Sequence, residues 1–455
     1  MVFMKKYALL SLLALASVII MNRPLLVRAQ SAPLTDAQRA ALQQELNQVE
    51  AEQKQAADDL SAAQSKSASL SRDISVLDAK IKAAQLDIKA KTLLIQSLGN
   101  DISVKEGVIK DLDQRIVQGQ ESLAQILRKT NEIDSYSLPE VVLSETDISK
   151  LFLDLDSFQS VESDLKLTFE QIRADKASTT AERDALDARL NAETDARYAI
   201  QQQQKNIQTS QAEEKQLLAI SKGNEKAYSS LVAQKAARAA QIRAALFALR
   251  DAAAIPFGQA LQYATLASQK TGVRPAFILA IITQESALGS NVGQCYVTNL
   301  QTGDGVKAKT GLPVAGVMSP TRDVPKFVQI LREIGGDPTK QVVSCPLDIG
   351  WGGAMGPAQF IPSTWVLMED EIASAVGISG MPDPWNPAHA FMASAIYLGN
   401  LGAGAGTYTA ERNAACKYYS GKACGLIRGN SAYGDSVVAK ADDIQRNQID
   451  VLAGL

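Results

Sequence analysis

A single carboxylic acid, Glu285, stands at the end of an apolar segment in the C-terminal half of the sequence. We expect a helix to begin at Arg274-Pro275 and to bury its side from Phe277 to Ile282. A carboxyl group directly behind a buried helix face loses water, which disfavours its charged form and raises its pKa. Cleavage of a glycosidic bond near neutral pH needs such an acid to protonate the leaving oxygen. The position of Glu285 therefore predicts a general acid for sugar chemistry; the alternative is a solvated residue at a helix end.

The residues around and after Glu285 favour the first interpretation. Several segments are similar, in the same order, to the motifs of lytic murein transglycosylases. They are residues 284–286, the glycine-rich loop 350–365, residues 385–390, residues 418–421 and the pair Tyr433-Gly434. The combination is far more specific than any one of its parts. We therefore expect residues 255–455 to form a domain that resembles this family.

The resemblance implies a lysozyme-like, mainly α-helical fold with no cofactor and no metal ion. Its substrate would be the β-1,4 bond between N-acetylmuramic acid and N-acetylglucosamine in peptidoglycan. The acid of the family maps onto Glu285. It would protonate the leaving oxygen and then take the proton of the muramoyl C6 hydroxyl, so that the sugar closes to a 1,6-anhydro product. This chemistry needs no second carboxylate, unlike that of glycosidases with paired carboxylates.

The same resemblance suggests which residues contact the substrate: Ser286, Met355, Gln359, Tyr418 and Tyr419. Gln359 matches the glutamine of the family's glycine-rich loop, and the glycines around Met355 allow the backbone to approach a ligand closely. One of the two tyrosines is expected to orient Glu285, and we favour Tyr418. Tyr419 stands where the family carries an asparagine.

Two other functions remain open at the level of sequence. A muramidase of the same fold would add water instead of closing the ring, with Asp348 as the candidate second acid. A non-catalytic cell-wall-binding adaptor would act through its coiled coil, although the intact segment 284–286 argues against lost turnover. The formal net charge of −3 argues against a nucleic-acid-binding protein, which would show a basic face.

All four cysteines lie in the C-terminal half of the chain, at Cys295, Cys345, Cys416 and Cys424. An even set within one domain of an exported protein is typical of disulfides. Three pairings are possible. We favour Cys295–Cys345 with Cys416–Cys424, because each pair brackets one loop-rich segment; reduced buried thiols are the alternative. A zinc site is disfavoured, since the sequence has a single histidine and no Cys-x-x-Cys pair.

The beginning of the chain resembles an export signal. Two lysines precede an apolar run from Tyr7 to Met21, and residues 27–29 follow at the usual place of cleavage. We predict a signal peptide at residues 1–29, and thus a protein of the periplasm or extracytoplasmic cell envelope. An uncleaved membrane anchor is the alternative, although the apolar run is short for a membrane span.

A heptad pattern runs without proline from Leu42 to Ile126. Isoleucine dominates the a positions, and leucine or alanine the d positions, as in a coiled coil. A weaker seven-residue rhythm follows over residues 151–222. We predict a coiled-coil arm over residues 36–250. An antiparallel hairpin of the two tracts within one chain and a parallel dimer of the first tract both fit the pattern.

The connection between the two tracts abandons the heptad near residues 131–158 and gathers many apolar side chains. It is similar to the hairpin tip of coiled-coil regulators of cell-wall hydrolases. That resemblance implies docking to a membrane cell-division complex, whereas a lobe that buries its own side chains is the plain alternative. The predicted protein is therefore mainly α, a long coiled-coil hairpin followed by a lysozyme-like α-helical catalytic domain.

Overall fold

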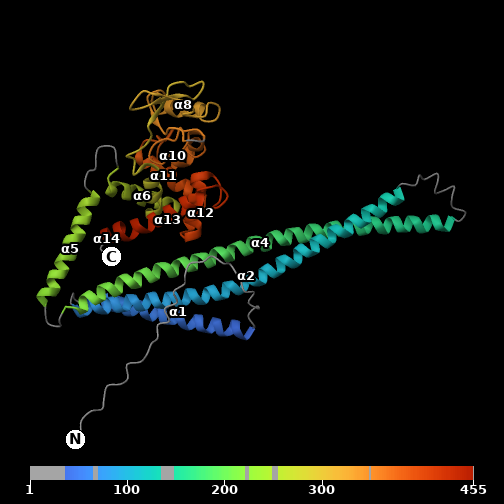
Figure 1. The fold of residues 1–455 in the computed structure, drawn as a ribbon, viewed down its shortest axis with the longest axis horizontal. Coiled ribbons are helices and arrows are strands. Elements are labelled where there is room, and N and C mark those ends of the chain that lie inside the picture. Colours follow the sequence, from blue (N-terminus) through green and yellow to red (C-terminus); the bar gives the residue numbers. More distant parts are fainter. Residues whose placement is uncertain are drawn as a thin grey trace, which may run out of the picture.

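The computed structural model describes residues 36–64, 70–134, 148–220, 225–247, 255–347 and 350–453. It has two parts, an arm of long helices and a C-terminal module, residues 255–453, that rests on the arm (Figure 1). The predicted mainly α fold is confirmed. Among the described residues, no helix is both long enough and apolar enough to cross a membrane. The predicted signal peptide and residues 135–147 of the predicted tip lobe lie outside the described residues.

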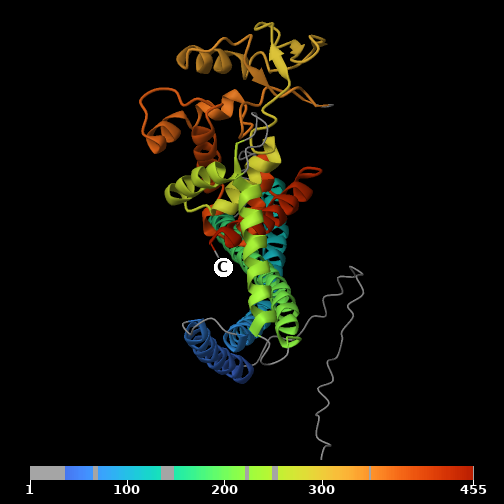
Figure 2. The same cartoon turned by 90° about the vertical axis from the view of Figure 1, so that its left-hand side faces the viewer.

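The arm consists of α1 (Asp36–Gln64), α2 (Leu70–Asp134), α4 (Ile148–Leu218) and α5 (Glu225–Phe247). Helices α2 and α4 pack as an antiparallel pair, and α5 connects the arm to the module (Figures 1 and 2). Two ion pairs show the register: Lys105 lies 2.8 Å from Glu182, and Arg115 lies 2.6 Å from Asp175. The later residue of α2 pairs with the earlier residue of α4, so the two helices run antiparallel. The chain therefore forms the intramolecular hairpin that the pattern allowed.

The heptad tract differs from the prediction in one respect, because it is divided between two helices. Helix α1 packs against α2 instead of continuing into it. The predicted d positions still form the buried seam, with Val49 and Ala56 on α1 and Leu77 and Leu98 on α2. Residues 65–69, between the two helices, lie outside the described residues. A heptad register alone does not reveal such a break.

The module is built around one central helix, α7 (Pro275–Ser286), whose residues from Ala276 to Ile282 are all fully buried. Four helices surround or support it: α6 (Phe257–Thr271), α11 (Pro387–Asn400), α12 (Tyr408–Ser420) and α13 (Asn430–Ile444). The remaining elements are α8 (Val324–Glu333), α9 (Pro362–Val366), α10 (Glu369–Val376), η1 (Ala403–Ala405), η2 (Gln445–Ile449) and α14 (Asp450–Ala453). A helix that is apolar on all sides is stable only inside a core, so α7 fixes where the other helices pack.

A small antiparallel sheet lies in the segment after α7. Its strands are β1 (Cys295–Val297), β2 (Gly305–Lys307), β3 (Pro313–Val314) and β4 (Val342–Val343), in the order β3-β2-β1-β4. Strands of two or three residues are too short to show an alternating pattern, which is why the sequence did not indicate them. The helix predicted from Val324 is confirmed as α8.

Both predicted disulfides are present. Cys295–Cys345 closes a loop with a sequence separation of 50 around the small sheet, and Cys416–Cys424 closes a loop of 8 at the end of α12. Gly434 of α13 packs against the second disulfide, because a Cβ at this position would lie 2.6 Å from the Cys416 Sγ. The disulfide and the glycine together set a close approach of α12 and α13.

Loop length predicts different contributions of the two disulfides to stability. Replacing both Cys295 and Cys345 by alanine should lower the free energy of unfolding by about 4 kcal/mol, because the unfolded chain gains the entropy of a long loop. The same change at Cys416 and Cys424 should cost about 2.6 kcal/mol on that basis. Denaturant unfolding of the two double variants measures which disulfide contributes more to the free energy of unfolding. A larger loss for the short loop would mean that local packing, not loop entropy, dominates.

Candidate active site

The end of α7 is held in an unusual backbone conformation directly after Glu285. Ala287 and Leu288 both have positive φ, at 50° and 55°, a region that residues with a side chain seldom adopt. Ser286 stabilises this exit: its hydroxyl donates to the carbonyl oxygen of Pro357 at 2.7 Å and accepts from the amide of Gly289 at 2.9 Å. The helix end that carries Glu285 is therefore fastened to the glycine-rich loop.

Glu285 faces α13, where the hydroxyl of Tyr433 donates a hydrogen bond to its Oε1. Burial raises the pKa of Glu285, and the bond from Tyr433 partly offsets the rise by stabilising the carboxylate. The pKa of Tyr433 is itself raised, first by burial and then by the charge of Glu285, so Tyr433 remains a donor at every ordinary pH. The predicted desolvated acid is thus accompanied by one hydrogen-bond donor.

The orienting tyrosine differs from the one we expected. The hydroxyl of Tyr418 donates to the carbonyl oxygen of Ala358 at 2.7 Å, so it binds the glycine-rich loop and not the acid. Tyr418 still lies close enough for the charge of Glu285 to raise its pKa, after burial as the larger cause. The sequence does carry a signal for Tyr433, which opens the motif 433–434 on a helix with buried Val437.

Tyr419 and Tyr433 form an aromatic pair beside the acid. Their rings are stacked with centroids 4.8 Å apart and an interplanar angle of 20°. The side chain of Tyr419 is 52% exposed, whereas Tyr418 packs inside against Phe360 and Tyr397. Tyr419 therefore presents a flat face next to the donor of Glu285, and Tyr418 supports the loop from within.

The glycine-rich loop places Gln359 in a strained conformation. Its φ is 54°, and strain at non-glycine residues of this kind gathers at functional sites. The side-chain amide nitrogen donates to the carbonyl oxygen of Gly356 at 2.8 Å and to that of Val292 at 3.3 Å. Among the described residues, none donates to its Oε1, which leaves this oxygen available to a ligand. Gly356 is required here, because a Cβ would lie 1.9 Å from the carbonyl oxygen of Pro384.

The other two predicted substrate contacts are buried. Ser286 and Met355 are each 1% exposed. The hydroxyl of Ser286 hydrogen-bonds to the backbone of Pro357 and Gly289. The backbone of Met355 pairs with that of Phe360 and closes the loop. We therefore assign both residues to shaping the site and leave them out of the substrate contacts proposed below.

The acid has no ionised neighbour within the described part of the chain that affects its pKa; burial and Tyr433 are the causes of its shift. Asp348, the candidate second acid, lies outside the described residues. In the same described part, no group of His, Cys, Asp and Glu side chains could hold a metal ion. The arrangement suits chemistry in which one carboxyl group gives and then takes a proton.

Comparison with known proteins identifies the module independently. The family model described as "Transglycosylase SLT domain" matches residues 191–419, slightly more than half of the chain. No curated protein and no solved structure gave a significant match. The matched region begins within α4 of the arm, well before the predicted boundary at residue 255.

The hydrogen bond from Tyr433 should set how far the pKa of Glu285 rises. Replacing Tyr433 by phenylalanine removes the donor that stabilises the carboxylate, so the pKa of Glu285 should move further upward. A carboxyl ¹³C chemical-shift titration with labelled glutamate measures it. Tyr263→Phe removes a hydroxyl that accepts from Gln259 on α6, and should leave the titration unchanged. A downward shift in Tyr433→Phe would contradict the role given to this bond.

Burial of Glu285 should also cost stability as the pH rises. Its pKa is higher in the folded chain than in the unfolded chain, so folded protein holds the proton more tightly. The contribution of Glu285 to wild-type stability should therefore fall as the pH rises from the unfolded pKa, about 4.3, through the folded pKa. Glu285→Gln cannot ionise, so its stability relative to wild type should increase over that window and then level off. Thermal unfolding between pH 3 and 8 tests this; a constant difference would contradict it.

Proposed function

Because the chain belongs to the transglycosylase SLT domain family, which indicates peptidoglycan degradation of the lytic transglycosylase type, we propose that it forms 1,6-anhydromuramoyl products with Glu285 as its acid. The observation that carries the proposal is the environment of Glu285. Burial raises the pKa of this carboxyl group and so favours the protonated form, which a general acid must present to its substrate.

The proposed reaction uses the Glu285 carboxyl group twice. It first gives its proton to the oxygen that links N-acetylmuramic acid to the leaving N-acetylglucosamine, and the glycosidic bond breaks. The resulting carboxylate accepts the proton of the muramoyl C6 hydroxyl, and the C6 oxygen forms the new bond to C1. The acid is thus regenerated without water. The Tyr433 hydroxyl stabilises the carboxylate between the two transfers.

Two residues are proposed to contact the sugar. Gln359 offers its free Oε1 to a hydroxyl or an N-acetyl amide, from a side chain fixed by two backbone hydrogen bonds. Tyr419 offers an exposed ring for stacking, supported from behind by Tyr433. Tyr418 acts indirectly, by holding the loop that carries Gln359.

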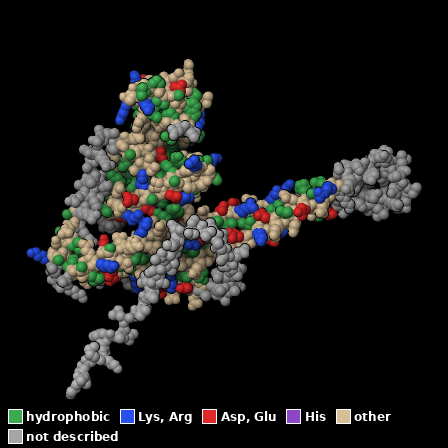
Figure 3. All heavy atoms as spheres, viewed as in Figure 1, with side chains coloured by type: hydrophobic (Ala, Val, Ile, Leu, Met, Phe, Trp, Pro, Cys, Tyr) green, Lys and Arg blue, Asp and Glu red, His purple; other side chains and the backbone are tan. Residues whose placement is uncertain are grey.

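Export and the role of the arm belong to the same proposal. Peptidoglycan lies outside the cytoplasmic membrane, which agrees with the predicted signal peptide at residues 1–29. The arm is proposed to position or regulate the enzyme. Docking of the tip near residues 131–158 to a membrane cell-division complex remains a prediction. The described part of the arm beyond the module is long and carries interspersed Lys, Arg, Asp and Glu side chains (Figure 3), as expected of a solvated spacer.

The product distinguishes the proposed reaction from its alternatives. Purified peptidoglycan incubated with wild-type protein should yield fragments that end in 1,6-anhydromuramic acid by mass spectrometry. Glu285→Gln should lower the rate by about 10² to 10⁴, the range of a lost general acid or base. Glu371→Gln serves as control, because this exposed residue on α10 contacts Asn400 and lies outside the site; its rate should equal that of wild type. Reducing-end products would indicate a muramidase, and no products a non-catalytic adaptor.

A further inference from the structure

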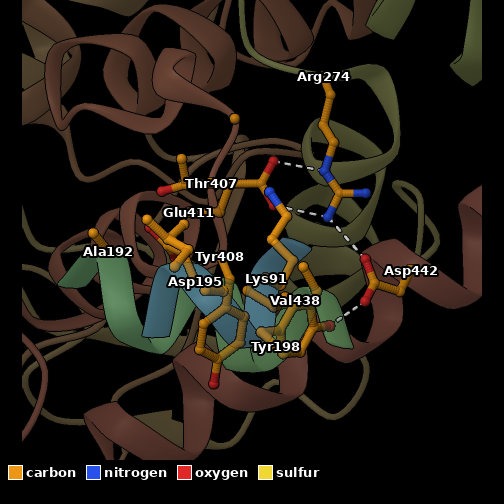
Figure 4. A pocket seen from close by; sticks show the side chains of 14 residues that line it. Lys91, Ala192, Asp195, Tyr198, Arg274, Thr407, Tyr408, Glu411, Val438 and Asp442 are labelled. Atoms are coloured by element: carbon orange, nitrogen blue, oxygen red, sulfur yellow. Dashed lines mark hydrogen bonds and ion pairs between the residues drawn. The ribbon is translucent and has the colours of Figure 1, made fainter. Parts of the chain in front are cut away.

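One face of α4 contacts α12 of the module, in addition to the contacts that α5 makes with α6 and α14. Asp195, Tyr198 and Gln202 are spaced three and four residues apart, so they share a side of the helix. Gln202 accepts a hydrogen bond from Arg446, which lies beyond the end of α13, at 2.6 Å. A cavity of about 530 Å³ lies at this junction and is lined by both parts, as Figure 4 shows for Tyr198 and its neighbours. The family match includes these arm residues.

Tyr198 completes a partly buried cluster of charges in the module. Arg274 donates to both carboxylate oxygens of Glu411, at 2.6 and 2.7 Å, and to Asp442 at 3.0 Å. One guanidinium therefore serves two carboxylates in a partly desolvated place, where an unsatisfied charge is costly. Tyr198 donates its hydroxyl to the other oxygen of Asp442 and stacks on Tyr408 with ring centroids 4.0 Å apart (Figure 4).

Asp195 provides a cap for a helix of the module. Its carboxylate accepts from the backbone amide of Thr409 at 2.7 Å and from the Thr409 hydroxyl at 2.9 Å. Thr409 lies in the first turn of α12, where backbone amides lack partners within the helix and a negative charge is favourable. The arm thus fixes the start of α12 as well as the end of α13.

Three module helices share one arrangement: one end lies at the arm junction and the other at the acid. Arg274 and Glu285 mark the two ends on α7, Thr409 and Tyr418 on α12, and Asp442 and Tyr433 on α13. Nine to eleven residues separate the two ends of each helix, which is about 14–17 Å at the helical rise. Contacts at the junction therefore set how the three helices align at the acid.

We propose that Tyr198 is a positioning residue for the Glu285–Tyr433 pair. By holding Asp442, and through it Arg274, Tyr198 joins the end of α13 to the start of α7. Helices α7 and α13 pack antiparallel. The contact between the start of α7 and the end of α13 therefore determines how Tyr433, at the start of α13, is placed against Glu285, at the end of α7. The inference rests on the proposed function for its kinetic effect, but its structural content is independent of catalysis.

The test compares Tyr198→Phe with wild type in the full chain. The variant keeps the ring and its stacking and loses only the hydroxyl, so we expect unchanged folding. With soluble glycan strands, kcat should fall about two- to thirtyfold, the size of a remote coupling, while KM stays within twofold. The basic limb of the pH–rate profile should move to higher pH, because a misplaced Tyr433 no longer holds down the pKa of Glu285. Amide hydrogen exchange in residues 430–444 should accelerate.

Tyr228→Phe is the matched control. Tyr228 of α5 donates to Asp73 of α2 at 2.8 Å, the same kind of bond wholly inside the arm. It should leave kcat, the pH profile and exchange in α13 unchanged. Wild-type kinetics and exchange in Tyr198→Phe would overturn the inference, as would equal effects in the control.

An inactive wild type and a Tyr198→Phe variant that does not fold can each be distinguished from failure of the inference. If the wild type forms no product, the proposed function fails, and hydrogen exchange alone decides the inference: faster exchange in α13 upholds it and unchanged exchange overturns it. If Tyr198→Phe does not fold, Asp195→Asn carries the same test from the start of α12, with faster exchange expected in residues 408–420. Unchanged exchange in a folded Asp195→Asn would overturn the inference.

Discussion

The desolvation of Glu285 is the constraint on which the rest of the module depends. An ionisable carboxyl group in an apolar place destabilises the fold unless it keeps its proton or gains a partner. The module meets the constraint with a central helix that is buried on every side and one donor from α13. More donors would stabilise the carboxylate and lower its pKa, whereas none would make the ionised state too costly. One tyrosine therefore reduces the cost of ionising Glu285 without cancelling the rise in its pKa that burial causes.

Such a balance requires accurate placement, and placement depends on structure on both sides of α7. At the end of α7, the Ser286 hydroxyl donates a hydrogen bond to the glycine-rich loop, directly before the two residues with positive φ. Glu285 and Gln359 therefore cannot move independently. At the start of α7, Arg274 binds Glu411 of α12 and Asp442 of α13. Burial raises the pKa of Glu411, and the bidentate contact with Arg274 opposes that rise. An ion-pair cluster at the start and a hydrogen-bonded serine at the end thus hold an otherwise apolar helix and fix its position along its own axis.

The sequence revealed features that depend on local pattern. The apolar run before Glu285 predicted α7, the heptads predicted the arm and its d-position seam, and the bracketing of loops predicted both disulfides. It did not reveal which distant helix reaches the acid, because Tyr433 lies 148 residues from Glu285 and two nearer tyrosines matched the motif. Nor did it reveal that Ser286 and Met355 face inward, since burial depends on the fold of residues 350–360 around them. The division of the heptad tract into α1 and α2 was missed because both halves keep the same register.

The domain boundary shows the same limit of local pattern most clearly. Composition changes near residue 255, and the arm appeared separable there, yet the side chains of Asp195 and Tyr198 satisfy polar groups that belong to the module. Removing α4 would uncover the Asp442 carboxylate, which would lose its bond from Tyr198, and the first turn of α12, which would lose its bonds to Asp195. An arm that blocked the substrate would instead need contacts near Glu285, Gln359 or Tyr419, and within the described ranges its polar contacts gather at the opposite helix ends. These contacts agree with the proposed role of Tyr198, in which the junction aligns α7, α12 and α13 and so places Tyr433 against Glu285.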